Sequence, residues 1–223
     1  MGIVRGVKEN KMKKIVLCNI MMKAEFYPFK YKVDGNSTIE YDGKVVFPIN
    51  GVLAKTLKKG DCVKVILLKK EDLDRNSEKN VGEFKSELDR INTEIGAEIE
   101  YKILSTPHNE SRLVQERLLK DIIAEFSDNA AIYADITYGT KSMPIIIFSA
   151  LNFAEKFFKA DIKNIIYGKV DFVKDKTTGK TNAQNPELFD MTALFYLNSI
   201  ANTMTCKTSE QAVKLFNSIL SED

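Results

Sequence analysis

The chain has 223 residues, of which 44% are hydrophobic and 29% are charged, a composition that supports one folded domain with a sizeable core. Its 33 basic and 31 acidic residues leave a net charge of +2, which argues against a protein that coats long nucleic acid through an overall positive field. There is no run of eighteen uncharged apolar residues and no secretory signal at the N-terminus, so we expect a cytoplasmic protein without a membrane span.

The first half of the chain alternates short β-type runs with helical ones. Residues 13–20 are apolar almost throughout, which predicts a strand in a sheet covered on both faces. Two aromatic stretches, at 26–33 and 39–47, flank the turn-forming Asp34-Gly35-Asn36 and predict an inserted β-hairpin. The patterns that follow predict a short helix at 48–57, a strand at 62–68, an amphipathic helix at 77–97 and a strand at 99–104.

The second half continues the alternation. Asn109 is a candidate cap for a helix that runs to about residue 126. The polar, glycine-containing segment 174–185 predicts a loop or hairpin tip. The remaining predicted elements are a strand at 130–136, a helix at 144–158 with proline in its first turn, a strand at 163–167, and helices at 190–204 and 208–220.

The order of these elements predicts the architecture. Strand and helix alternate about five times, which indicates an α/β, Rossmann-like fold: a mostly parallel sheet with helices on both faces and an inserted β-hairpin after strand 1. We expect an N-terminal extension at 1–12, one Rossmann-like domain at 13–204 and a C-terminal helical tail at 205–223.

Cysteine and histidine usage gives no metal signature. Cys18 and Cys62 lie in apolar runs, where cysteine usually acts as a small buried hydrophobic residue. Cys206 is isolated, no CxxC pair is present, and His108 is the only histidine in the chain. We therefore expect no metal site and no cofactor.

The segment 135–144, DITYGTKSMP, is the best candidate for a ligand site, because ligands of open α/β sheets bind beyond the carboxyl ends of strands. Gly139 permits a sharp turn, Lys141 adds a cation, and the following helix offers free N–H groups to an anion. Tyr138 offers a ring on which a base could stack. The hydroxyl groups come from Thr137, Thr140 and Ser142.

A plainer interpretation explains the same residues equally well: an ordinary strand-to-helix turn in which a Thr or Ser caps the helix. The segment matches neither GxGxxG nor GxxxxGK[ST], so a nicotinamide or Walker-type site lacks its motif. Two further loops would lie at the same edge of the sheet. One carries His108, although a lone histidine is more often a surface residue. The other carries Asn19 and Met21, and methionine is more often a core residue.

The motif resembles the Asp-x-Thr-His-Gly-[Phe/Thr]-[Arg/Lys]-Ser-[Leu/Met]-Pro signature of CARF domains, the CRISPR-associated Rossmann fold of type III CRISPR systems. The likeness covers roughly residues 13–204 and departs from the signature at Tyr138, where the family has His. Tyrosine is a poor general acid or base near neutral pH. The other matching segments are Phe47-Pro48, the Pro-x-Asn-Glu sequence at 107–110, Ile166-Tyr167-Gly168 and residues 188–195.

The resemblance implies a homodimer that binds cyclic tetra- or hexa-adenylate across its two-fold axis. The implied ligand-binding residues are Asn19, Ile20, Met21, Asn109, Thr137, Tyr138, Gly139, Thr140, Lys141 and Ser142.

Many members of the family carry an effector domain, and we expect none here. No histidine follows His108, and no arginine stands four to six residues before it, so a HEPN ribonuclease motif is missing; the segment after residue 204 is short for any other effector. Two functions remain. The first is a metal-independent ring nuclease that uses the ligand's own 2′-hydroxyl, with Lys141, Ser142 and His108 as catalytic residues. The second is a non-catalytic sensor or sink that acts through a partner protein.

Overall fold

The computed structural model describes residues 13–25, 27–174 and 181–220. Its centre is a set of five mutually parallel strands, as expected. The expected N-terminal extension at 1–12 and the tip at 175–180 lie outside the described residues. The five strands are β1 (Lys13–Asn19), β3 (Cys62–Lys70), β4 (Glu98–Thr106), β5 (Ala131–Asp135) and β6 (Asp161–Lys174).

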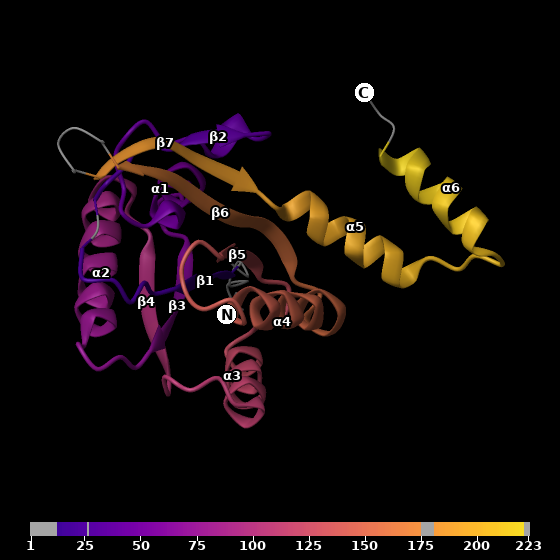
Figure 1. Cartoon of the computed structure of the whole chain (residues 1–223), viewed down its shortest axis with the longest axis horizontal. Coiled ribbons are helices and arrows are strands. Elements are labelled where there is room, and N and C mark those ends of the chain that lie inside the picture. Colours follow the sequence, from indigo (N-terminus) through magenta and orange to yellow (C-terminus); the bar gives the residue numbers. More distant parts are fainter. Residues whose placement is uncertain (1–12, 26, 175–180, 221–223) are drawn as a thin grey trace, which may run out of the picture.

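Two further strands extend the sheet beyond β6. β7 (Thr181–Asp190) pairs antiparallel with β6, and the short β2 (Lys32–Asp34) pairs parallel with β7. Within the described residues the sheet therefore has seven strands in the order β2-β7-β6-β5-β1-β3-β4 (Figure 1). This mostly parallel sheet confirms the predicted fold class.

The strand order places a switch point between β1 and β5. From β1 the chain moves outward through β3 to β4, then crosses back to the other side of β1 as β5 and β6. Cys18 of β1 lies opposite Asp135 of β5, so the two strands end side by side. In open α/β sheets this crevice is the usual ligand position, and the motif loop begins there.

Helices cover both faces of the sheet, as predicted. α1 (Pro48–Thr56) and α2 (Asn76–Ile95) pack on one face through Leu53, Phe84 and their neighbours. The opposite face is covered by α3 (Arg112–Ala124), α4 (Met143–Phe158) and the first turn of α5 (Thr192–Thr203), which buries Phe195. None of the helices in the described ranges is long and apolar enough to cross a membrane.

The insertion after β1 differs from the regular hairpin that the sequence predicts. Its only antiparallel pairing in the described part of the chain is one bridge between Phe29 and Val45. The first aromatic stretch instead supplies β2 to the open edge of β7, where Val33 lies opposite Leu188. The Asn36 side chain donates to Asp190 Oδ2 (2.8 Å), which ties the turn to the end of β7. The first aromatic stretch thus pairs with the edge strand β7 and not with the second aromatic stretch, its predicted hairpin partner.

The end of the chain extends beyond the sheet. Figure 1 shows α5 and α6 (Ser209–Leu220) extending away from the body of the molecule. α6 has a strongly amphipathic sequence, yet none of its described residues is buried. The C-terminal helices predicted from the sequence are therefore present, but α6 contributes nothing to the core.

The start of α1 is stabilised by a side chain from α2. Phe47, at the N-cap position, provides no side-chain hydrogen bond. The Glu87 carboxylate instead accepts from the backbone N–H groups of Val46 (2.7 Å) and Phe47 (3.1 Å) and from Asn50 Nδ2 (2.9 Å). These N–H groups precede or begin the helix, where no intrahelical partner exists. Glu87 thus takes the role of a cap and joins α1 to α2.

We expect Glu87→Ala to lower the free energy of unfolding by about 3 kcal/mol, because it leaves several partly buried donors without an acceptor. Urea denaturation followed by circular dichroism measures this change. Glu83→Ala, an exposed glutamate on the same helix, is the matched control and should change stability by less than about 0.5 kcal/mol. Equal stabilities of the two variants would contradict the capping role.

Candidate functional site

The motif loop, residues 136–142, joins the end of β5 to the start of α4. Gly139 has φ +100°, a conformation that L side chains rarely adopt. A Cβ at this position would lie 3.2 Å from Asn19 Cγ and 3.2 Å from Met143 Cγ. Glycine therefore allows the loop to lie directly against the end of β1.

Asp135 holds the loop in place from below. Its carboxylate is 1% exposed, and it accepts from the N–H of Thr137 (2.7 Å) and from the N–H of Ile49 in the first turn of α1 (3.3 Å). Burial raises the pKa of Asp135 to about 6, and the hydrogen bonds from Thr137 and Ile49 only partly offset that effect. Through its two hydrogen bonds the Asp135 carboxylate links β5, the loop and α1, which is a structural role.

The next two side chains of the motif also face the protein. Thr137 Oγ1 accepts from the N–H of Gly168 on β6 (2.8 Å). The Tyr138 hydroxyl donates to the carbonyl of Val46 (2.8 Å), and its ring packs edge-on against Phe47. Burial raises the pKa of Tyr138 well above its usual value. Tyr138 is thus partly buried and packs against the core, and its predicted stacking role stays a prediction.

The outer half of the loop forms a polar network with two residues that the sequence did not indicate. Ser142 Oγ donates to Glu110 Oε1 (2.8 Å) and lies 3.0 Å from Thr140 Oγ1. Lys70 Nζ, from the end of β3, donates to the same Glu110 oxygen (2.8 Å). Hydrogen bonds from Lys70, then from Thr140 and Ser142, lower the pKa of Glu110 to about 2. The loops that follow β3, β4 and β5 are thus joined at one carboxylate.

The sequence alone gives little basis for predicting this network. Lys70 ends an apolar strand at the edge where ligands bind, which is the one feature that could have singled it out. In the sequence Glu110 stands out only as the last residue of the Pro-x-Asn-Glu segment at 107–110. Its contact with Ser142 spans 32 positions of sequence, so no local pattern reveals it.

His108 and Asn109 occupy the exposed loop between β4 and α3. The carbonyl of His108 accepts from Lys70 Nζ (3.1 Å), whereas its imidazole makes no hydrogen bond or ion pair with the residues described. Asn109 Oδ1 accepts from the N–H of Ser111 (3.3 Å). The helix begins at Arg112 with Ser111 at the N-cap, so the predicted capping role of Asn109 is wrong by two positions.

The end of β1 supplies an unusual polar group. Asn19 is 1% exposed, and neither atom of its amide has a hydrogen-bond partner in the described part of the chain. Leaving buried polar atoms unpaired costs stability, so such atoms usually serve a ligand, a water molecule or a functional state. The side chains of Ile20 and Met21 are buried in the core, which removes them from the ligand-facing surface.

Lys141 completes the site. Its side chain is exposed and forms no ion pair with a described residue. It precedes α4, whose first turn carries no acidic residue to offset the positive end of the helix dipole. The N–H of Met143 donates to the carbonyl of Thr140 (3.0 Å) and Pro144 has no N–H, so the helix contributes mainly through its dipole. The site therefore combines a free cation, a helix N-terminus, two hydroxyl groups and a buried amide, which together favour an anionic ligand.

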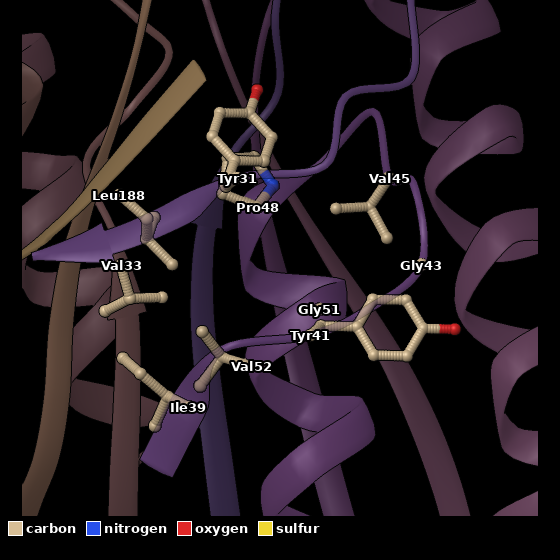
Figure 2. A pocket seen from close by; sticks show the side chains of 10 residues that line it. All are labelled: Tyr31, Val33, Ile39, Tyr41, Gly43, Val45, Pro48, Gly51, Val52 and Leu188. Carbon is tan, nitrogen blue, oxygen red and sulfur yellow. The ribbon is translucent and has the colours of Figure 1, made fainter. Parts of the chain in front are cut away.

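A small hollow lies away from the motif loop, beneath the insertion (Figure 2). Apolar side chains from the insertion, α1 and β7 line it, among them Val33, Ile39 and Val52, and it holds a volume of about 10 Å³. That is room for about one water molecule, so it does not fit a nucleotide. Across the residues described, no group of three or more His, Cys, Asp or Glu side chains is placed to hold a metal ion.

No protein-family model matches this sequence, and no curated protein shows significant similarity to it. The fold and the site define an open α/β protein with an anion-favouring loop at its switch point.

The buried Asp135 predicts a pH dependence of stability. Its folded pKa of about 6 lies above the ordinary value of 3.8, so the folded state holds the proton more tightly, and this contribution is lost as pH rises through about 6. We expect the free energy of unfolding of the wild type to fall by about 1 kcal/mol, relative to Asp135→Asn, between about pH 5 and about pH 7.5. Denaturation curves of both proteins at each pH measure the difference. Parallel pH profiles would show that Asp135 titrates normally.

Proposed function

We propose that this protein binds a small cyclic oligoadenylate at the 136–142 loop and cleaves it as a metal-independent ring nuclease of a type III CRISPR system. The observation that carries this proposal is the meeting of Lys141, the N-terminus of α4 and the unpaired amide of Asn19 at the switch point. These groups favour a phosphodiester. The resemblance of DITYGTKSMP to the CARF signature supports the adenylate assignment, and such a messenger is made inside cells, so a cytoplasmic location is part of the proposal.

The chemistry needs little from the protein. The ligand's 2′-oxygen attacks the adjacent phosphorus, the bond from phosphorus to the 5′-oxygen breaks, and a 2′,3′-cyclic phosphate and a 5′-hydroxyl form. The proton of the 2′-hydroxyl leaves, and the departing 5′-oxygen gains one. The protein holds the attacking and leaving oxygens in line and stabilises the charge on the phosphate oxygens.

Lys141 and the hydroxyl or N–H of Ser142 are the proposed charge-stabilising groups. Tyr138 is unsuited to proton transfer, since its hydroxyl is bonded to Val46 and burial raises its pKa. His108 is the remaining proposed acid–base group. It lies two residues from Glu110, which contacts Ser142, and histidine is the side chain that most often serves as a general acid or base.

The second candidate is a sensor or sink that holds the ligand without cutting it. Two observations favour it. Tyr138 replaces the family's histidine and is a partly buried residue packed against the core. The C-terminal helices α5 and α6 also carry exposed apolar residues that could transmit binding to a partner, such as Leu194 and Val213.

Binding and product analysis separate these functions. Incubation of the purified protein with cyclic tetra- and hexa-adenylate in EDTA should give linear products that carry a cyclic phosphate end. Lys141→Ala should weaken binding at least about tenfold, because it removes one charge-assisted contact to phosphate. Lys120→Ala, an exposed lysine on α3, is the control and should behave as the wild type.

Other outcomes are equally informative. Tight binding of an uncut ligand would exclude the nuclease and support the sensor or sink. If neither ring binds, both functions are wrong, and a dinucleotide-binding enzyme of a different kind becomes the alternative.

We further propose that the protein is a homodimer and that the second copy covers the C-terminal helices. Leu194 of α5 and Val213 and Leu220 of α6 are more than half exposed. A 12-residue helix that buries none of its described residues is marginal in water. A two-fold dimer also matches a ring ligand built from repeated units, since each protomer reads an equivalent half.

The dimer predicts a specific effect of substitutions on α6. In the full-length protein, Val213→Glu together with Leu220→Glu should shift the molecule from twice the chain mass to the monomer mass in sedimentation velocity. Lys214→Glu, on the same helix, is the charge control and should remain dimeric. Lys214→Glu should keep the wild-type far-UV spectrum, and the double variant should lose no more than the helix signal of α6, because α6 buries none of its described residues. A wild-type protein that sediments as a monomer would overturn the dimer.

A further inference from the structure

We propose that Glu110 is an internal anion that occupies the phosphate position of the site, and that a ligand phosphate binds by displacing it and taking over Lys70. This inference rests on the proposed function in one respect only, the identity of the ligand that carries the phosphate. It adds two residues, Glu110 and Lys70, to the binding site, one as a competitor and the other as a ligand-binding cation.

The geometry of the carboxylate is that of a bound anion. Glu110 Oε1 accepts from Lys70 Nζ and from Ser142 Oγ, each at 2.8 Å. Thr140 Oγ1 lies 3.0 Å from Ser142 Oγ, in the same cluster. An ammonium and hydroxyl groups beside a helix N-terminus are the donors that phosphate sites use. In the described structure the side chain of Glu110 fills that place.

The buried ammonium of Lys70 requires an anion beside it, with or without a ligand. Its side chain is only 7% exposed, and a buried ammonium is costly unless it is paired. Within the described residues its partners are Glu110 and the carbonyl of His108. A lysine that served stability alone would be better placed in water. Here the ion pair keeps a desolvated cation ready at the edge of the sheet where ligands bind.

Glu110 is able to leave. Its side chain is 39% exposed, and it stands in the exposed loop before Arg112, where α3 begins. Rotation of this side chain into solvent needs no movement of the sheet or of α3. Its pKa, lowered to about 2 by Lys70, Thr140 and Ser142, keeps the carboxylate ionised throughout the neutral range. Mild acidification therefore does not release Glu110 from Lys70, whereas an anion that binds Lys70 more tightly displaces it.

A second, independent feature points to a ligand at this place. The buried amide of Asn19 lies under Gly139 in the same loop, and none of the described residues provides a partner for it. Glu110 satisfies the outer hydroxyl groups of the loop but does not satisfy Asn19. Glu110 thus makes only some of the interactions that a ligand could make at this site. A ligand that also pairs with Asn19 would bind more favourably than Glu110 does.

The test uses the full-length protein and two probes, inorganic phosphate alone and cyclic tetra-adenylate. Glu110→Gln keeps the size of the side chain and an oxygen for Lys70, but removes the competing charge. We expect it to raise the affinity for both probes about tenfold in calorimetric titration. Glu94→Gln changes net charge equally at an exposed position on α2 and should leave both affinities unchanged. Lys70→Gln in the Glu110→Gln background should abolish the gain.

The outcomes separate this inference from the proposed function. If Glu110→Gln tightens phosphate binding while no variant binds the cyclic adenylate, the internal anion stands and the proposed ligand is wrong. If the wild type binds the cyclic adenylate and Glu110→Gln does not change its affinity, the ligand stands and the internal anion is overturned. Affinities that fall in Glu110→Gln would show that Glu110 is a structural or ligand-binding residue instead.

Discussion

The carboxylate of Asp135 is the group on which the geometry of the site depends. It lies buried at the end of β5 and accepts from two backbone N–H groups, one in the motif loop and one in α1. Because α1 is itself anchored by Glu87 from α2, the loop is connected through two helices to the far side of the domain. This support preorganises the loop, which favours the binding of an anion.

The motif therefore has an inner half that holds the loop in place and an outer half that is available to a ligand. Asp135, Thr137 and Tyr138 point into the protein and hold the loop, whereas Thr140, Lys141 and Ser142 lie on its outer half. Tyrosine at position 138 fits the inner face, since its ring fills a space beside Phe47 and its hydroxyl reaches Val46. A side chain that packs in this way makes the loop more rigid but is not available for proton transfer. The proposed catalysis therefore depends more on Lys141.

Local patterns predicted most of the fold, and long-range contacts account for what they missed. Apolar periodicity and turn residues act over a few positions, so the parallel strands, the helices on both faces and the loop at 136–142 were all predictable. The inward turn of Tyr138 depends on Val46, 92 residues away, and the Lys70–Glu110 pair spans 40. The hairpin prediction was wrong for the same reason: β2 found a better edge on β7, more than 150 residues along the chain.

The isolated position of α6 has a thermodynamic consequence. Helix formation in a segment of 12 residues is weakly favourable at best when its apolar face stays in water. In the proposed dimer, folding of α6 is linked to burial of that face by the second copy, so the fraction of helix in this segment would depend on protein concentration. The C-terminal part of the chain would then take part in a coupled equilibrium, in which the amount of ordered helix reports on the state of association.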